Sequence, residues 1–202
     1  MNTQLHTPCF IVHKNLVDQQ LQLLKEALAR YWDNAVIGYS YKTNALPWLI
    51  DYYNRNGCYA EVVSDDEYRL GKRIGVADNR FVYNGPAKSR ETFLEALRNG
   101  CVVNIDSNRE LQWLDDLEPG GTYRLGIRVN FDIEAACPGH SACGEEGGRF
   151  GFCYESGKLK EAIDCIKAKG FSVSCLHLHT SSKTRGIEIY KAIARTACEI
   201  AE

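Results

Sequence analysis

Along this sequence a short apolar strand followed by an amphipathic helix recurs, and this repeat restricts the folds that the chain can adopt. Runs of β-branched and aromatic residues predict strands at 35–41, 59–63, 81–83, 101–105, 123–129 and 172–179. Apolar residues recur at helical spacing in 17–31, 91–97, 159–168 and 187–201. A parallel strand needs a crossover helix to return to the sheet, so the repeat predicts an α/β fold with a parallel sheet.

Polar residues at the strand ends favour a barrel over a doubly wound sheet. Nearly every predicted strand ends in a polar or ionisable residue, among them Lys42, Glu61, Asn84, Arg128 and His177. In a β/α barrel such ends converge on one mouth, whereas a doubly wound sheet gathers only those at its switch point. We therefore predict a TIM-type (β/α)8 barrel.

The predicted barrel is incomplete, because the repeat supplies about six of the eight units that a TIM-type barrel needs. We interpret residues 1–202 as one truncated barrel domain, with the glycine-rich stretch 138–151 as a long loop over the mouth. An open barrel exposes two strand edges. We therefore expect the chain to be a fragment of a longer protein or to close its core through a partner.

Composition excludes several classes of protein. The net charge is −2, and 24 basic residues are scattered among 26 acidic ones, so no basic stripe can follow a nucleic acid or an anionic membrane. No window approaches the roughly 18 apolar residues of a membrane span, and the N-terminus lacks a signal pattern. We expect a cytoplasmic protein. Its nine cysteines form no Cys-x-x-Cys pair, and the nearest two, Cys137 and Cys143, predict no metal site or disulfide.

Lys42 is the candidate catalytic residue. It ends an otherwise apolar strand within the segment 38–47, Gly-Tyr-Ser-Tyr-Lys-Thr-Asn-Ala-Leu-Pro. We expect the strand end to bury the amine and keep it uncharged, because only a neutral amine forms a Schiff base. The alternative is a lysine that extends from the strand end into solvent.

Eight motifs occur in an order and spacing that resemble one known family. They are Thr-Pro-Cys-Phe-Ile-Val at 7–12, Tyr-Ser-Tyr-Lys-Thr-Asn at 39–44, Glu-Val-Val-Ser at 61–64 with Glu67, Asn84-Gly85 with Lys88, Asn-Ile-Asp-Ser at 104–107 with Glu110-Leu111, Arg-Val-Asn at 128–130, Arg-Phe-Gly at 149–151, and His-Leu-His-Thr-Ser-Ser at 177–182. Together they resemble the diaminopimelate/ornithine decarboxylases, enzymes with an alanine-racemase-like barrel that depend on pyridoxal 5'-phosphate (PLP). The resemblance covers nearly the whole chain.

The resemblance implies a role for five residues. Lys42 matches the lysine that forms a Schiff base with PLP. His179 matches the histidine that stacks on the cofactor ring, and Ser182 matches a serine that binds its phosphate. Glu61 stands where the family usually has aspartate, and Arg128 matches a position beside the cofactor. From the residues alone His179 could instead be a packed histidine, Ser182 a helix cap, and Arg128 half of a structural ion pair.

Other matched positions are less tightly assigned. The resemblance implies that His177 and Asn84 line the mouth, since alternate strand residues such as His177 and His179 share a face. Ser181 departs from the family, which usually has glycine before the phosphate serine, and the extra side chain could crowd the phosphate. Arg149 is expected to serve the fold or the loop.

Three parts of the family are missing from this sequence. They are a glycine-rich phosphate loop, a Glu-Pro-Gly-Arg segment whose glutamate pairs with the pyridine nitrogen, and a C-terminal β-domain that completes the active site across a homodimer. The resemblance therefore implies that the full-length protein is a dimer that decarboxylates a basic or diamino acid. We expect this chain alone to bind PLP weakly and to turn over little or nothing.

Three alternatives stay open on the sequence. A PLP-dependent amino-acid racemase shares the barrel and the lysine, although Thr-Asn-Ala-Leu-Pro at 43–47 is typical of the decarboxylases. A non-catalytic relative could keep the barrel for binding or regulation. A Schiff-base aldolase without PLP would explain fewer of the motifs. The particular amino acid used as substrate is not assigned by the sequence.

Overall fold

The computed structural model describes residues 7–139, 150–180 and 186–202. The chain divides into two units, residues 1–37 and residues 38–202. In the first unit, helix α1 (Lys14–Ala29) confirms the helix predicted around 17–31, and Leu21 is its buried residue. None of the described helices is both long and apolar enough to span a membrane.

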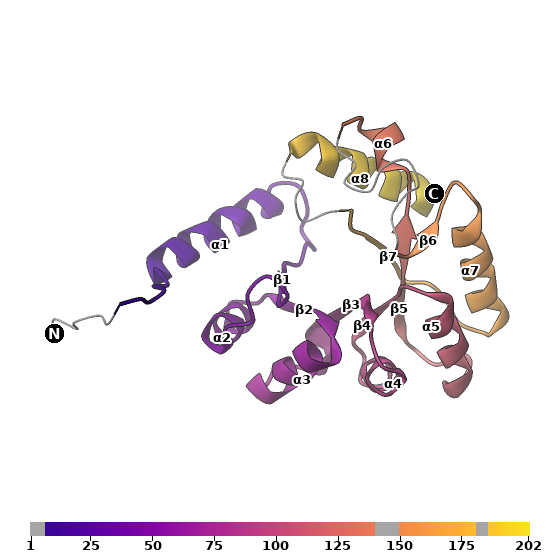
Figure 1. Ribbon diagram of the computed structural model, residues 1–202, viewed down its shortest axis with the longest axis horizontal. Coiled ribbons are helices and arrows are strands. Elements are labelled where there is room, and N and C mark those ends of the chain that lie inside the picture. The colour runs from indigo at the N-terminus through magenta and orange to yellow at the C-terminus, as the bar shows by residue number, and fades with distance from the viewer. Residues whose placement is uncertain (1–6, 140–149, 181–185) are drawn as a thin grey trace. The chain divides into compact units, whose positions relative to one another are not determined.

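The second unit is built on a parallel sheet whose strands follow the order of the sequence (Figure 1). The strands are β1 (Gly38–Ser40), β2 (Tyr59–Ser64), β3 (Phe81–Ala87), β4 (Val102–Ile105), β5 (Arg124–Asn130), β6 (Phe152–Cys153) and β7 (Cys175–Leu178). Every paired strand is parallel to its neighbour. Sequential order without a reversal is the arrangement of a barrel wall rather than of a doubly wound sheet.

Helices connect the strands. They are α2 (Pro47–Arg55), α3 (Asp65–Ile74), α4 (Arg90–Arg98), α5 (Asn108–Trp113), α6 (Ile133–Ala136), α7 (Lys158–Ala168) and α8 (Ile187–Ala201), with short 3-10 turns at Asp78–Arg80 and Leu114–Asp116. Figure 1 shows α3, α4, α5 and α7 arranged along the outer side of the strands. The predicted helices at 91–97, 159–168 and 187–201 are confirmed as α4, α7 and α8.

The barrel is open, as the repeat predicts. In the described part of the chain β1 pairs only with β2, and β6 and β7 each pair only with β5, so the sheet does not close on itself. β1 is shorter than the predicted strand 35–41, because residues 35–37 form no strand. Pairing still continues past Ser40, since the Tyr41 N–H donates to the Glu61 carbonyl at 3.0 Å.

Strand β5 pairs with three others, which the sequence did not reveal. Its first residues pair with β4, residues 126–129 pair with β7, and Val129 and Asn130 pair with β6. The two residues of β6 are too few to show a strand periodicity, and they directly follow the segment interpreted as a loop. The predicted sixth strand is therefore β7.

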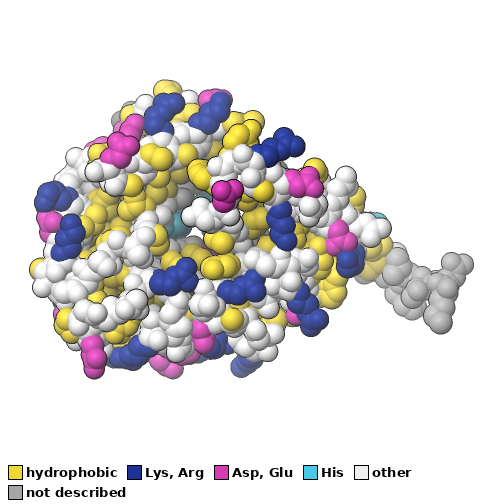
Figure 2. Space-filling view, turned by 180° about the vertical axis from the view of Figure 1, so that it is seen from behind, with side chains coloured by type: hydrophobic (Ala, Val, Ile, Leu, Met, Phe, Trp, Pro, Cys, Tyr) yellow, Lys and Arg dark blue, Asp and Glu magenta, His cyan; other side chains and the backbone are white. Residues whose placement is uncertain are grey.

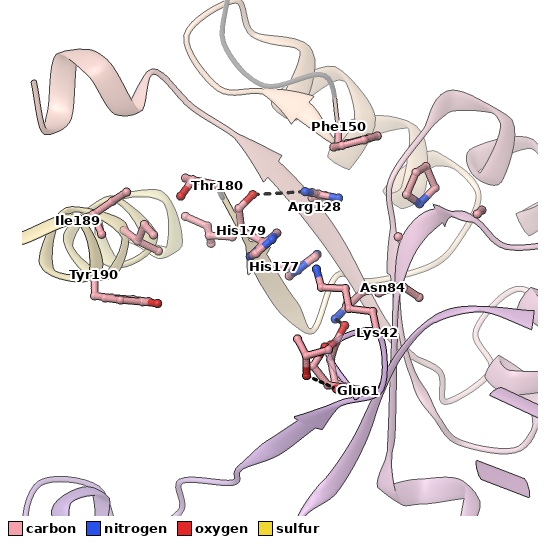
Figure 3. Close-up of a pocket in the computed structure, with 18 residues that line it drawn as sticks. Lys42, Glu61, Asn84, Arg128, Phe150, His177, His179, Thr180, Ile189 and Tyr190 are labelled. Atoms are coloured by element: carbon pink, nitrogen blue, oxygen red, sulfur yellow. Dashed lines mark hydrogen bonds between the residues drawn. The ribbon is translucent and has the colours of Figure 1, made fainter. Parts of the chain in front are cut away.

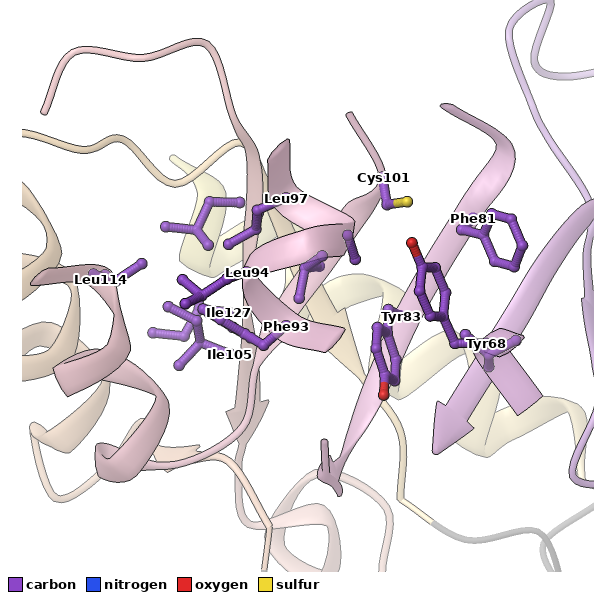
Figure 4. Packing of buried hydrophobic residues seen from close by; sticks show 14 of the residues in the cluster. Tyr68, Phe81, Tyr83, Phe93, Leu94, Leu97, Cys101, Ile105, Leu114 and Ile127 are labelled. Carbon is purple, nitrogen blue, oxygen red and sulfur yellow. The ribbon is translucent and has the colours of Figure 1, made fainter. Parts of the chain in front are cut away.

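The core lies between the sheet and the helices that cover it (Figure 4). Tyr68 of α3 stacks on Tyr83 of β3 with ring centroids 5.4 Å apart and meets Phe81 edge-on. All three side chains are almost fully buried. Burying a side chain of this size stabilises the fold by about 1.5–3 kcal/mol. This layer holds the apolar strand residues outward, so the alternate, more polar residues face the inside of the curved sheet.

Candidate active site

A cavity of about 850 Å³ lies at the carboxyl ends of the strands. It brings together Lys42, Glu61, Asn84, Arg128, His177 and His179, the six predicted site residues that the structure describes (Figure 3). Figure 2 shows a hollow in which a histidine is visible, with hydrophobic side chains around it. Ser181, Ser182, Arg149 and Cys143 lie outside the described residues. The structure thus gathers the candidate residues, while their individual roles stay predictions.

Lys42 lies just past the end of β1, and its side chain points toward His177 and His179 (Figure 3). Tyr41 before it is buried in the core, but Lys42 itself is exposed. The expectation of a buried amine is therefore wrong for this chain, because the open edge beside β1 leaves the mouth accessible. Among the described residues, no carboxylate lies within ion-pair distance of the Lys42 amine.

The two histidines lie at the end of β7 and differ in their surroundings. Burial, and after it the positive charges of Arg128 and other nearby residues, together lower the pKa of His177 to about 3. Burial and the Lys42 charge also lower the pKa of His179, while Glu61 acts in the opposite direction. Both rings are therefore neutral at pH 7. His179 is exposed at the cavity, so it is not a packed core histidine.

A chain of hydrogen bonds crosses the inner face of the sheet and ends at Glu61. The Cys175 thiol donates to Asn104 Oδ1 at 3.3 Å, and Asn104 Nδ2 donates to Asn84 Oδ1 at 2.6 Å. Asn84 Nδ2 then donates to Glu61 Oε1 at 2.8 Å. Burial raises the pKa of Cys175, so the thiol keeps the proton that it donates. This chain of hydrogen bonds fixes the carboxylate of Glu61, which stands where the decarboxylase family usually has aspartate.

The absence of a side chain at Gly126 makes room for this chain of hydrogen bonds. A Cβ at Gly126 would lie 1.9 Å from Asn104 Oδ1 and 2.4 Å from Cys175 Sγ. Both distances are too short for non-bonded atoms, so any residue with a side chain would clash here. Gly126 pairs directly with Asn104 on one side and with Cys175 on the other. The amide of Asn104 therefore reaches Cys175 by lying across the bare backbone of β5.

Arg128 is buried and is held by an ion pair, as one interpretation of the sequence predicted. Its NH1 group donates to Asp106 Oδ2 at 2.9 Å, and its NH2 group donates to the His179 carbonyl at 3.3 Å. The guanidinium also lies over the Phe150 ring, 4.8 Å from its centroid. Arg128 lines the cavity as well, so its two interpretations are compatible.

Three residues of this region were not predicted to contribute, although each lies in a quoted motif. Asn104 belongs to the hydrogen-bond chain, and Asp106 holds Arg128. Lys88 forms a fully buried ion pair with Glu110, with 3.0 Å between Nζ and Oε1. In the sequence, these contacts are signalled by polar residues inside otherwise apolar segments, because a buried polar side chain needs a partner.

Comparisons with known proteins agree with this geometry. Residues 14–202 match the model of a family described as pyridoxal-dependent decarboxylase, pyridoxal binding domain. The chain belongs to this family. This pyridoxal-binding domain is 26% identical in sequence to a diaminopimelate decarboxylase of Aquifex aeolicus over 188 residues. The aligned region covers 92% of this chain and 44% of that protein. It is 29% identical to the diaminopimelate decarboxylase of Deinococcus radiodurans over 196 residues, covering 96% and 48% of the two chains.

Solved structures support the barrel. Diaminopimelate decarboxylase from Methanocaldococcus jannaschii, solved with L-lysine, superposes with a TM-score of 0.83 at 24% identity, over 96% of this chain and 46% of that one. A lysine/ornithine decarboxylase of Vibrio vulnificus, solved with cadaverine, gives a TM-score of 0.67 at 21% identity over 92% and 45%. This pyridoxal-binding domain spans about half the length of the relatives it matches.

The residues of the cavity fit a pyridoxal group. An accessible lysine amine, which can bond to an aldehyde, points toward the neutral ring of His179, which offers a flat surface for an aromatic ring. His177 adds a buried Nδ1 that has no hydrogen-bond partner among the described residues. A buried polar atom without a partner costs free energy, so the site has an unused polar group for a ligand or a water molecule.

Proposed function

We propose that this chain is the cofactor-holding part of a PLP-dependent decarboxylase that acts on a diamino or basic amino acid, most similar to diaminopimelate decarboxylase. The observation that carries the proposal is the meeting of Lys42 with two neutral histidines in one cavity of a pyridoxal-binding domain. The relatives support the substrate class, because several are named diaminopimelate decarboxylase and three of the similar structures were solved with L-lysine.

Four of the cavity residues have a task in this proposal. Lys42 would hold the cofactor through its aldehyde until the amino group of the substrate takes the place of the lysine amine. His179 would offer its ring to the cofactor ring, and Glu61, held by Asn84, presents a fixed carboxylate beside Lys42. When bound, PLP withdraws electrons from the carbon that carries the departing carboxylate. Ser182 is proposed to hold the phosphate.

The proposal extends to the complete protein. Residues 1–202 form one PLP-binding barrel domain, and further sequence supplies the remaining strands and a C-terminal β-domain. The active protein is a homodimer in the cytoplasm, where its cysteines stay reduced. The support for a longer protein is that each relative is about twice the length of the matched region.

The cofactor assignment is tested by trapping. The chain is incubated with PLP, reduced with borohydride and digested, and the labelled lysine is identified by mass spectrometry. We expect the label on Lys42, and Lys42→Met should remove it. Lys72→Met, a change in a half-buried ion pair with Asp78 that lies outside the cavity lining, serves as the control and should leave labelling unchanged. Labelling that persists in Lys42→Met, or that maps to another lysine, would contradict the proposal.

A further inference from the structure

Four charged side chains are buried in the described part of the chain, and they form one cluster. Lys88, Asp106, Glu110 and Arg128 are each at most 7% exposed. Lys88 pairs with Glu110, the backbone N–H of Asp106 donates to the Glu110 carboxylate, and Arg128 pairs with Asp106. We call these four residues the buried charge cluster. Its formal charge is zero.

Stability alone does not account for such a cluster. Removing ions from water costs several kcal/mol for each, and well-packed apolar residues in their place often stabilise a protein as much or more. A buried ion pair does fix the geometry of what it touches, because its hydrogen bonds are directional and charge-assisted. The buried charge cluster is therefore expected to hold other groups in place.

The cluster reaches the cavity through Arg128, which is its only member in the cavity wall. One guanidinium nitrogen is taken by Asp106 and another donates to the carbonyl of His179. The plane of the guanidinium lies over Phe150, a second residue of the wall. Arg128 thus connects the cluster to the backbone of His179 and to the ring of Phe150.

Asp106 also holds the segment that contains Phe150. The N–H of Gly151 lies 3.2 Å from both Asp106 Oδ1 and the Asp106 carbonyl oxygen. Gly151 has φ +78°, and a Cβ there would lie 2.6 Å from the Arg128 carbonyl oxygen. The segment therefore packs directly against Arg128, with Asp106 bonded to both. One carboxylate fixes two parts of the cavity wall that are far apart in the sequence.

We propose that Asp106 is a positioning residue that sets the place of His179 and Phe150 through Arg128, supported from behind by the Lys88–Glu110 pair. Asp106 does not line the cavity, so it acts without touching a ligand. The inference rests on the proposed function for its purpose, since His179 and Phe150 would flank the cofactor. Its geometric part concerns the chain alone.

The test substitutes Asp106→Asn and compares it with Asp116→Asn. Asp116 pairs with Arg90 at the surface, so the control makes the same chemical change in an exposed arginine pair. The first readout is the imidazole NMR signals of His179 in the cofactor-free chain. We expect them to shift and broaden in Asp106→Asn and to stay unchanged in Asp116→Asn.

The second readout is PLP affinity, followed by absorbance and by borohydride labelling of Lys42. We expect Asp106→Asn to weaken binding about 10-fold, the scale on which outer-shell partners act at metal sites. Wild-type His179 signals in Asp106→Asn would overturn the inference. A wild-type chain that binds no PLP at Lys42 would instead refute the proposed function, while the cofactor-free His179 signals still decide the inference.

A double variant separates positioning from stability and also covers the case in which Asp106→Asn does not fold. Asp106→Leu with Arg128→Met replaces the whole pair by apolar groups of similar size. We expect the urea midpoint to recover toward that of the wild type, with the His179 signals still displaced. If the midpoint and the His179 signals both recover, the pair is only structural and the inference is wrong.

Discussion

Replacing Gly126 by alanine should damage this protein more than an ordinary glycine-to-alanine change in a strand. The new methyl group would have to occupy the space of the Asn104 amide, 1.9 Å from Oδ1 and 3.0 Å from Cγ, and of Cys175 Sγ. Both neighbours lie on strands hydrogen-bonded to β5, so neither backbone can move aside without loss of pairing. The Asn104 side chain must therefore rotate away.

The cost has two parts. Extra volume in a packed interior costs about 1–3 kcal/mol. Rotation of the amide breaks its bonds to Asn84 and Cys175, and each buried polar group left without a partner costs about 1–3 kcal/mol. Counting one such group, the free energy of unfolding should fall by about 2–6 kcal/mol, the sum of these ranges.

Urea unfolding followed by circular dichroism measures this loss. Gly38→Ala is the matched control, because Gly38 also lies in a strand and a Cβ there would meet only Glu61 Cβ at an ordinary 3.5 Å. It should be neutral or stabilise slightly, since alanine restricts the unfolded chain. In the Gly126→Ala background, Asn104→Ala should cost far less than it does alone, because the clash and the broken bonds are shared. Equal stability of Gly126→Ala and the wild type would refute the packing argument.

Two predictions concern pH. Burial alone would raise the pKa of Asp65, but hydrogen bonds from Thr92, Ser89 and Tyr83 lower it to about 2. Its contribution to stability is present above the unfolded pKa near 4 and is lost as the pH falls toward 2, so Asp65→Asn should flatten acid unfolding in that window, measured by circular dichroism. His177, with its pKa lowered to about 3, should favour folding above pH 6.5 and lose that contribution as the pH falls toward 3. The NMR signals of the His177 ring should remain those of a neutral imidazole from pH 8 to 5. A titration midpoint near 6.5 would contradict the burial of the His177 ring.

The arrangement of strands and helices could be predicted from the sequence because it follows from local patterns. β-branched runs mark the strands, and the polar residues that end nearly every strand mark the mouth, so local patterns predict that Lys42 and His179 share one site. The motif order did the same for Glu61, Asn84 and Arg128. The strand and helix signals lie within a few residues of one another, where periodicity is informative, and the motif order needs only the positions of short segments along the sequence.

What the sequence could not reveal depends on contacts between distant residues. The exposure of Lys42 is set by what covers the mouth, and residues 39–44 carry no information on that. The need for glycine at 126 appears only when the register places Asn104 and Cys175 on either side of it. Asp106 and Arg128 are 22 positions apart, and their pairing follows from the adjacency of β4 and β5.

The unequal burial of the strands has a consequence for hydrogen exchange. β4 and β5 are buried along most of their length, whereas β1 and β7 are half-buried or exposed throughout. Local opening costs least where a strand is paired on one side and packed loosely, so backbone amides of β1 and β7 should exchange with solvent well before those of β4 and β5. Lys42, just past β1, and His177 in β7 thus lie beside or within the most readily opened strands, and Asn104 and Arg128 lie in the most protected ones.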